Sequence, residues 1–299
     1  MQEPPATSPG PPAASATHGP RPAVVAGLVP ARWGSTRFPG KPLHPIAGRP
    51  LIEHVWNRCR HARQLDLLAV ATDDPRIADA ATAFGARVLM TRDDHASGTD
   101  RCAEAAAALA DEGVTHVINI QGDEPLIDPA LIDQLAALLR SDPAIAMVTA
   151  ASRLTDPAEI ASEHVVKVVL DDHGRALYFS RSPIPFFRRP APDFPAGPPF
   201  ESLRHIGIYG YRIDVLQRLV SLPPAPLEQV ESLEQLRALS AGIAIHVVLT
   251  AHASPGIDTP AQAAALERHF QLAQGTDPAS VPQPGPASGS HRSPSTFAP

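Results

Sequence analysis

The sequence predicts an α/β fold with a mostly parallel sheet and a smaller β-rich lobe. Short apolar runs alternate with amphipathic segments along most of the chain, which is the pattern of strands joined by crossover helices. In the second half, strand-like runs follow one another, and the turn Asp172-His173-Gly174 indicates a hairpin. Hydrophobic residues make up 43% of the 299 residues, which is enough to build a substantial core.

Most of the alternation lies in the first half of the chain. Pro50 marks the start of one helix, and Thr99 and Gly113 mark the cap and the stop of another. The expected strands are 23–31, 65–72, 86–91 and 115–123, and the expected helices are 51–62, 75–84, 99–113 and 129–141.

The second half contains the hairpin and the closing elements. We expect strands at 144–152, 204–212 and 243–249, with the hairpin at 165–180. Helices are expected at 226–242 and from Pro260 onward.

Proline divides the chain into a domain and two tails. Residues 1–22 and 274–299 are rich in Pro, Ala, Ser and Gly and predict disordered tails, which leaves 23–273 as the folded domain. A third proline cluster, within 183–199, is interspersed with phenylalanines. Such a loop is expected to be a lid or a subunit contact, and an ordinary ordered loop explains it equally well.

Charge and apolar content exclude several classes of protein. The formal net charge is -6, so a basic nucleic-acid-binding face is not expected. No apolar run approaches the roughly 20 residues needed to span a bilayer, and the N-terminus lacks the features of a signal peptide. We therefore expect a cytoplasmic protein without membrane insertion. Cys59 and Cys102 have no metal-ligand spacing and are expected to be buried thiols.

The loop after the first strand carries three cations around two glycines. Arg32, Arg37 and Lys41 surround Gly34 and Gly40, which permit a close approach of the backbone, so the loop could cradle a triphosphate. An ordinary surface turn is the alternative. The loop is not a Walker A motif, because proline follows the lysine, and no G-x-G-x-x-G fingerprint of a dinucleotide-binding dehydrogenase occurs.

Lysine is rare in this chain. Of the 25 basic residues only Lys41 and Lys167 are lysines, and the others are arginines. A compact ammonium and a planar guanidinium are not interchangeable as ligands of anions. Each surviving lysine therefore marks a position where arginine could be unsuitable, although chance survival explains two lysines as well.

Two aspartates occupy positions suited to a hard cation. Asp123 follows the strand 115–121 and is preceded by Gly122, and Asp258 lies just before the final helix. Magnesium usually takes one or two carboxylates together with waters and substrate phosphates. A simple helix-capping role is the alternative for Asp258.

Three further polar groups have both a functional and a structural interpretation. The turn Ser97–Thr99 offers backbone amides to an anion or a base, or it caps the following helix. Residues on one stripe of the expected helix 226–242 are typical of a solvated face, and alternating residues of the strand 204–212 are typical of core packing. The stripe contains Glu228, Ser232 and Gln235, and the strand residues are His205, Tyr209 and Tyr211.

Long motifs of this chain resemble those of the 3-deoxy-manno-octulosonate cytidylyltransferases, also called CMP-Kdo synthetases. The resemblance runs from Val24 to about His269 and includes LVPARWGSTRFPGKPL, ATDD, MTRDDHASGTDR, INIQGDEPLI, VVKVVLDDHGRALYFSRSPIP, RHIGIYGYR, PLEQVESLEQLR and GIDTPAQ. It implies a Rossmann-like nucleotidyltransferase sheet, Mg²⁺ as cofactor, CTP and Kdo as substrates, and a homodimer. A related sugar acid, such as 8-amino-Kdo or sialic acid, and a non-catalytic nucleotide-binding homologue are the alternatives.

The resemblance also implies roles for individual residues. Arg32, Lys41 and Asp123 would be catalytic. The phosphates of CTP would be held by Arg32, Ser35, Arg37 and Lys41, and its nucleoside by Ser97, Gly98, Thr99 and Arg101. Asp123 and Asp258 would bind magnesium, and the sugar acid would contact Gln121, Arg181, His205, Tyr209, Glu228 and Gln235. The chain departs from the family pattern at Trp33-Gly34, at Phe38 and most strongly after Pro185, which puts the dimer contact in question.

Overall fold

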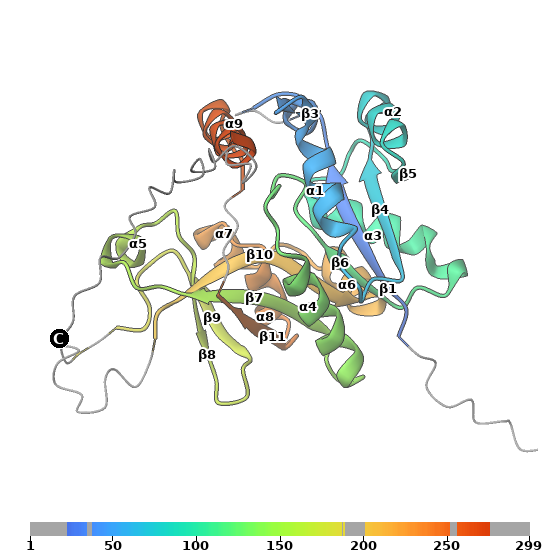
Figure 1. The fold of residues 1–299 in the computed structure, drawn as a ribbon. Coiled ribbons are helices and arrows are strands. Elements are labelled where there is room, and N and C mark those ends of the chain that lie inside the picture. The colour runs from blue at the N-terminus through green and yellow to red at the C-terminus, as the bar shows by residue number, and fades with distance from the viewer. Residues whose placement is uncertain (1–22, 35–37, 187, 189–200, 252–255, 276–299) are drawn as a thin grey trace, which may run out of the picture.

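The computed structural model describes residues 23–34, 38–186, 188, 201–251 and 256–275, and the side chains up to residue 271. The tail predicted at 1–22, nearly all of the tail predicted at 274–299 and most of the proline-rich loop lie outside the described residues. The described elements are arranged around one sheet with helices on both faces (Figure 1). The predicted α/β class with a mostly parallel sheet is confirmed.

The main path of the sheet contains seven strands in the order β11-β7-β10-β6-β1-β4-β5. Neighbours along it are parallel except for β10, which runs antiparallel to both β6 and β7. The strands are β1 (Val25–Ala31), β4 (Leu67–Thr72), β5 (Arg87–Met90), β6 (His116–Asn119), β7 (Met147–Arg153), β10 (Leu203–Arg212) and β11 (Ile245–Thr250).

The predicted hairpin is present and forms a β-rich extension of this sheet. Strand β8 (Lys167–Leu170) pairs with β10 at one edge and with β9 (Ala176–Ser180) at the other, antiparallel in both cases. A separate two-stranded ribbon is formed by β2 (Pro45–Ile46) and β3 (Arg49–Pro50).

Helices cover both faces of the sheet because each has one apolar side. On one face, α1 (Leu51–Cys59), α2 (Pro75–Ala83) and α4 (Pro129–Ser141) pack on one hydrophobic cluster. On the other face, α3 (Gly98–Ala108), α6 (Ile213–Ser221) and α8 (Gln235–Ser240) pack on a second cluster. The remaining helices are α5 (Pro157–Ala161), α7 (Pro226–Glu231), α9 (Pro260–Gly275) and the 3-10 turns η1 (Lys41–Leu43) and η2 (Ala110–Glu112).

The single helix expected at 226–242 is wrong. The segment forms α7 and α8, and Ser232 between them has a left-handed backbone with φ 53°. A residue in that conformation ends a right-handed helix. Glu228 and Gln235 therefore do not share one helical stripe.

Helix α3 and its neighbourhood also differ from expectation. The cap is Ser97 rather than Thr99, and Ser97 and Asp100 form a reciprocal capping box. The helix ends at Ala108 and continues as η2 before Gly113. Helix α6 was not expected at all.

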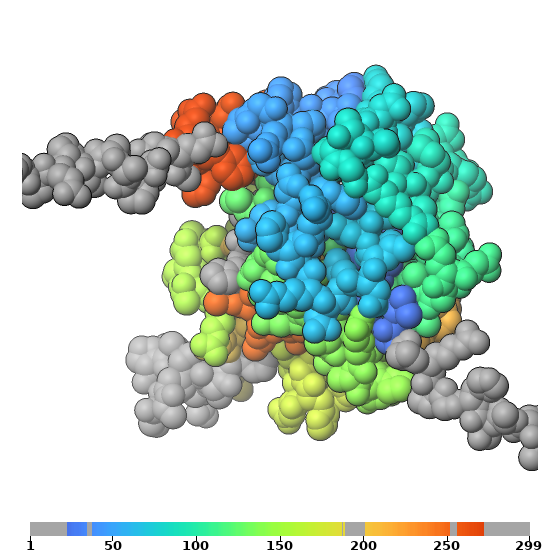
Figure 2. Space-filling model, turned by 45° about the vertical axis from the view of Figure 1, so that its right-hand side comes forward, coloured from blue at the N-terminus to red at the C-terminus, as the bar shows by residue number. Residues whose placement is uncertain are grey.

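A third and smaller hydrophobic cluster joins the two ends of the described chain. It contains Phe38, Ile46 and Leu51 from the N-terminal part and Ile257, Ala263 and Leu266 from the C-terminal part. Figure 2 shows helix α9, in red, against the blue N-terminal segment. Within the described residues, no helix is long and apolar enough to cross a membrane.

Candidate active site

The candidate site lies where parallel strands β1 and β6 end side by side. The register pairs Leu28 with Asn119, so the segments that follow both strands emerge at one edge of the sheet. Gly122 passes so close to β1 that a Cβ atom there would lie 2.7 Å from the carbonyl oxygen of Pro30. Only glycine permits this approach, which brings Asp123 next to the first loop.

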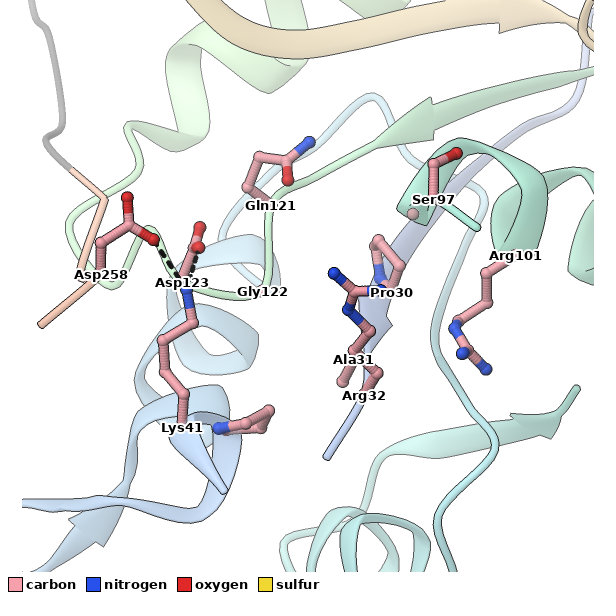
Figure 3. A pocket seen from close by; sticks show the side chains of 12 residues that line it. Pro30, Ala31, Arg32, Lys41, Ser97, Arg101, Gln121, Gly122, Asp123 and Asp258 are labelled. Carbon is pink, nitrogen blue, oxygen red and sulfur yellow. Dashed lines mark hydrogen bonds and ion pairs between the residues drawn. The ribbon is translucent and has the colours of Figure 1, made fainter. Parts of the chain in front are cut away.

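A cavity of about 260 Å³ occupies this edge. Figure 3 shows Asp123, Asp258 and Lys41 at one side, Ser97 and Arg101 at the other, and Arg32 between them. The lining residues are Pro30, Ala31, Arg32, Lys41, Pro42, Ser97, Gly98, Arg101, Gln121, Gly122, Asp123 and Asp258.

Lys41 joins the two aspartates in the described structure. Its Nζ lies 2.5 Å from Oδ2 of Asp123 and 3.2 Å from Oδ1 of Asp258. The lysine side chain is only 15% exposed, so the ammonium is largely withdrawn from water. Three charged groups from distant parts of the sequence are therefore in direct contact.

The backbone fixes Asp258 beside Asp123. The amide of Ile257 donates to the carbonyl oxygen of Asp123 at 2.8 Å. Helix α9 is capped by Thr259, whose Oγ1 accepts from the amide of Gln262, while Oε1 of Gln262 accepts from the amides of Asp258 and Thr259. The capping-only alternative for Asp258 is therefore wrong, because its carboxylate pairs with Lys41.

The loop that carries Lys41 is folded on an aromatic ring. Gly40 has φ 68°, and its amide donates to the carbonyl oxygen of Trp33 at 3.2 Å. The guanidinium of Arg76 lies 3.5 Å from the centroid of the Trp33 ring. Arg32 is exposed at the cavity. Ser35 and Arg37 lie outside the described residues.

The opposite wall is the start of helix α3. The Ser97 hydroxyl accepts from the amide of Asp100, which confirms the capping interpretation of this turn for Ser97. Arg101 is buried, and its guanidinium lies 3.1 Å from Oδ1 of Asp73 and donates to the Thr91 hydroxyl. Thr99 is buried beneath the same turn.

A second cavity of about 430 Å³ adjoins the first and shares Gly98, Gln121, Asp123 and Asp258 with it. The two aspartates therefore lie between the two cavities. The lining residues of the second cavity are Gly98, Thr99, Asn119, Gln121, Asp123, Glu124, Met147, His205, Gly207, Tyr209, Tyr211, Leu219, Leu233, Glu234, Gln235, Gly256 and Asp258.

The aromatic wall of the second cavity is uncharged. Burial lowers the pKa of His205 to about 3, and its Nε2 lies 3.0 Å from the Thr149 hydroxyl. Burial raises the pKa values of the Tyr209 and Tyr211 phenols well above the usual value. At neutral pH all three side chains are therefore neutral groups that donate or accept hydrogen bonds.

The structure brings some of the expected sugar-contacting residues together and leaves others apart. Gln121, His205, Tyr209 and Gln235 line the second cavity, and Gln121 donates to the carbonyl oxygen of Gly207 at 3.1 Å. Arg181 and Glu228 line neither cavity.

Both of these residues are engaged elsewhere. Arg181 donates to the carbonyl oxygens of Glu231 and Glu163 at 2.9 and 3.0 Å. Glu228 accepts from the guanidinium of Arg237, which lowers the pKa of the Glu228 carboxyl. Their expected sugar contacts remain predictions.

Sequence reasoning missed two buried polar residues of the second cavity. Asn119 is 1% exposed and Glu124 is 7% exposed, and each has a side-chain oxygen without a hydrogen-bond partner among the residues the structure describes. Burial, and then the charge of Asp123, raises the pKa of Glu124 to about 8. Asn119 could have been found, because it lies two residues before Gln121 and so shares a face with it in the strand expected at 115–123.

Two acidic residues of the site lie close enough together to share one cation. Among the described residues, no group of three or more His, Cys, Asp or Glu side chains could hold an ion. Asp123 and Asp258 nevertheless converge on a single cationic centre, the ammonium of Lys41. A pair of carboxylates is the donor set that magnesium takes when substrate phosphates and waters complete its shell.

Comparisons with known proteins find relatives that match most of the chain. The Cytidylyltransferase family model matches residues 26–245. A 3-deoxy-manno-octulosonate cytidylyltransferase of Geobacter sulfurreducens is 49% identical over 240 residues, which cover 79% of this chain and 95% of that relative. The enzyme of the same name from Pseudomonas syringae pv. tomato is 50% identical over 238 residues, covering 78% and 92%.

Solved structures give the same result. A CMP:2-keto-3-deoxy-manno-octonic acid synthetase in complex with CTP superposes with a TM-score of 0.77 at 42% identity, covering 84% of this chain and all (100%) of that one. A 4-diphosphocytidyl-2C-methyl-D-erythritol synthase from Anaerococcus prevotii has a TM-score of 0.55 at 14% identity, covering 83% and 96%, and shows a shared fold alone.

Proposed function

The chain belongs to the cytidylyltransferase family, and from this membership we propose that it transfers CMP from CTP to the anomeric hydroxyl of Kdo, giving CMP-Kdo and pyrophosphate. One observation carries the proposal. The two cavities meet at Asp123 and Asp258, so a nucleotide in the smaller one and a sugar acid in the larger one would lie on either side of the same charged pair.

The larger cavity can contact the hydroxyls of the second substrate through its neutral polar groups, which lie beside the carboxyl groups of Asp123, Glu124, Glu234 and Asp258. The phenol, imidazole and amide groups there can each donate to or accept from a hydroxyl. The smaller cavity is bordered by Arg32, Lys41 and Arg101, which suits a polyphosphate.

In the proposed reaction the anomeric oxygen attacks the α-phosphorus of CTP in line. A bond forms between the anomeric oxygen and the α-phosphorus. The bond between the α-phosphorus and the oxygen that bridges it to the β-phosphate breaks, pyrophosphate leaves, and the hydroxyl proton passes to solvent. The reactants are both anionic, so positioning and neutralisation of charge should dominate over general base catalysis. Arg32 and Lys41 would hold the phosphates and disperse the developing charge.

The proposed activity requires magnesium. Asp123 and Asp258 would hold the ion, which when bound would lower the pKa of the attacking hydroxyl and neutralise phosphate charge. Lys41 forms an ion pair with each carboxylate, which holds the two aspartate side chains next to each other and offsets one of their two negative charges.

We place the reaction in the cytoplasm, where CTP is synthesised, and propose a homodimer as the working form. Leu177 of β9 and Val230 of α7 are 61% and 83% exposed, which provides apolar surface for a contact between copies. Sedimentation of the purified protein at several concentrations tests the dimer, and a monomer at all of them would refute it.

The function is tested by measuring pyrophosphate release from CTP, Mg²⁺ and Kdo. Parallel reactions contain 8-amino-Kdo or sialic acid in place of Kdo, UTP in place of CTP, or EDTA in addition. Release with CTP and Kdo that EDTA abolishes is the expected result. Release only with another sugar acid would move the substrate and keep the chemistry, while CTP binding without release from any pair would refute catalysis.

A further inference from the structure

The contacts within the fold do not explain why a polar amide side chain occupies position 119. It is the last residue of β6 and is 1% exposed, yet its Oδ1 has no hydrogen-bond partner within the described part of the chain. A buried polar atom left unpaired is costly, so such atoms call for an explanation in a folded protein. A leucine at this position would fill similar space without that cost.

The strand register directs the side chain of Asn119 into the second cavity. Val117 and Tyr211 face each other across β6 and β10, and both belong to the cluster on the α3 side of the sheet. Asn119 lies two residues after Val117 and opposite Tyr209, so it faces the same side. Asn119, Tyr209 and Tyr211 all line the cavity of about 430 Å³.

A second unpaired amide lies on the lining of this cavity. Gln235, at the start of α8, is 6% exposed, and its Nε2 also lacks a partner among the described residues. The cavity therefore presents an unpaired acceptor from the sheet and an unpaired donor from a helix. Both are neutral, as are His205 and Tyr209 beside them at neutral pH.

We propose that Asn119 determines sugar specificity by hydrogen-bonding one of the secondary hydroxyls of the acceptor, together with Gln235. A hydroxyl can donate to one amide and accept from the other, which would satisfy both buried atoms at once. A site with buried polar groups rejects an analogue that lacks the matching hydroxyl, because those groups then stay unpaired. This inference rests on the proposed sugar-acid cytidylyltransferase activity and adds a residue that recognises a hydroxyl of the acceptor sugar.

The test compares Kdo with three analogues that each lack one secondary hydroxyl, at C4, C5 or C7, in the wild-type protein and in Asn119→Leu. In the wild type, one analogue should have a kcat/KM about 10- to 100-fold below that of Kdo. In Asn119→Leu, the kcat/KM for Kdo should fall by a similar factor, while that analogue should be affected little. The KM for CTP should stay within about twofold, since Asn119 does not line the smaller cavity.

Two further variants separate specificity from folding. Asn119→Thr suits a strand better and shortens the reach of the polar group, so it should lose the same discrimination if Asn119→Leu is poorly folded. His116→Gln is the matched control, because His116 is buried on the same strand with an unpaired Nε2 among the described residues but lines neither cavity. It should leave discrimination among the analogues unchanged.

The possible outcomes distinguish this inference from the proposed function. Wild-type turnover of Kdo with unchanged discrimination in both Asn119 variants would overturn the inference alone. Wild-type turnover of a different sugar acid would overturn the choice of Kdo, and the same comparison with monodeoxy forms of that acid would decide the role of Asn119. Turnover of no acid by the wild type would overturn both.

Discussion

The two lysines of this arginine-rich protein occupy different kinds of site, and both use the compact shape of the ammonium. Lys41 bridges two carboxylates beside the cavities. Lys167 is fully buried and donates to the carbonyl oxygens of Ser162, Val165 and Arg181. Burial lowers the pKa of Lys167. A planar guanidinium could not point donors at three converging oxygens in this way.

Replacement of Lys41 by arginine should therefore reduce activity. In Lys41→Arg the larger fork would push Asp123 and Asp258 apart, so we expect kcat to fall by more than about tenfold. Steady-state kinetics with CTP and the sugar acid varied in turn would measure the loss. Arg49→Lys, at an exposed ion pair with Glu53, is the control and should retain activity. Full activity of Lys41→Arg would show that charge alone matters at this position.

Neutralising Asp123 should have a larger effect. Asp123→Asn keeps the shape of the side chain but removes its charge, so we expect kcat to fall by about 10²–10³-fold, as for loss of one preorganised electrostatic group. Rates at saturating Mg²⁺ would be compared with Asp111→Asn, an exposed residue of η2. A loss below tenfold would contradict a direct role of Asp123 in holding the metal.

His205 should make stability sensitive to acid. Its folded-state pKa of about 3 is lower than the value of about 6.5 for an unfolded chain, so between these values only the unfolded state binds the proton. The contribution of the neutral imidazole to the free energy of unfolding is complete above pH 6.5 and is lost as the pH falls toward 3. By pH 5 the loss is at most about 2 kcal/mol.

Urea unfolding at pH 7 and pH 5 would test this effect. The wild type should lose up to about 2 kcal/mol more than His205→Asn between the two pH values, because the variant has no imidazole to protonate. An equal loss in both proteins would show that His205 is hydrated enough to titrate normally.

The residue types in the sequence indicated which ligands the site could bind better than they indicated which residues contact one another. Lys41 and Asp123 were expected near phosphate and metal because each follows a strand whose carboxyl end lies at the same edge of the sheet. The place of Asp258 beside them was implied only by the family resemblance. The engagement of Arg181 with Glu231 could not be anticipated, since it depends on how α7 packs on the hairpin. Tertiary packing, rather than local pattern, decides such contacts.

At the scale of elements, periodicity predicted the strands and long helices but not the interruptions between them. The break at Ser232 is not visible in the sequence because no glycine or proline marks it, although Ser232 has the left-handed backbone that ends α7. Helix α6 begins at Ile213, directly after β10 ends at Arg212, and no capping side chain marks its start. In both cases the local sequence pattern does not determine where the helix begins or ends.

The contact between the ends of β1 and β6 can be tested at Gly122. In Gly122→Ala the new Cβ would lie 2.7 Å from the carbonyl oxygen of Pro30, which is backbone and cannot rotate away. We expect a loss of about 1–3 kcal/mol in the free energy of unfolding, together with reduced activity as Asp123 shifts.

Gly207→Ala is the control, since no described atom lies within 4 Å of a Cβ built there. Denaturant unfolding and the KM for CTP would be measured for both variants. Equal stability of the two would mean that β6 can move away from β1 at little cost.

At the scale of the whole molecule, the site depends on a small core separate from the two main clusters. Phe38, Ile46 and Leu51 pack with Ile257, Ala263 and Leu266, and this cluster lies next to both Lys41 and Asp258 in the sequence. The fold class was predictable from the alternation of strands and helices. This long-range contact was not, because a helix at the end of the chain carries no local mark of the segment it will cover.

Weakening the small core should affect activity more than stability. Leu266→Ala removes packing from α9, so we expect kcat/KM for CTP to fall severalfold as Asp258 loses its fixed position, with about 2 kcal/mol of global stability lost, the low end for a buried leucine. Leu135→Ala, in the large cluster under α4, should show the reverse pattern, with about 2–5 kcal/mol lost and activity retained in the folded fraction. Steady-state kinetics and urea unfolding of both variants would test this prediction. Full activity of Leu266→Ala would contradict a role of the small core in positioning Asp258.

The shared ammonium of Lys41 also has a consequence for the order in which the chain is made. Lys41 and Asp123 leave the ribosome long before Asp258 and the helix that anchors it, because translation runs from the N-terminus at about 5–20 residues per second. Strands β1 and β6, which Lys41 and Asp123 follow, can pair while Asp258 is still inside the exit tunnel. A nascent chain would thus hold a nearly complete cradle for CTP without the second carboxylate, and the pair of aspartates would form only after Asp258 and α9 have been made.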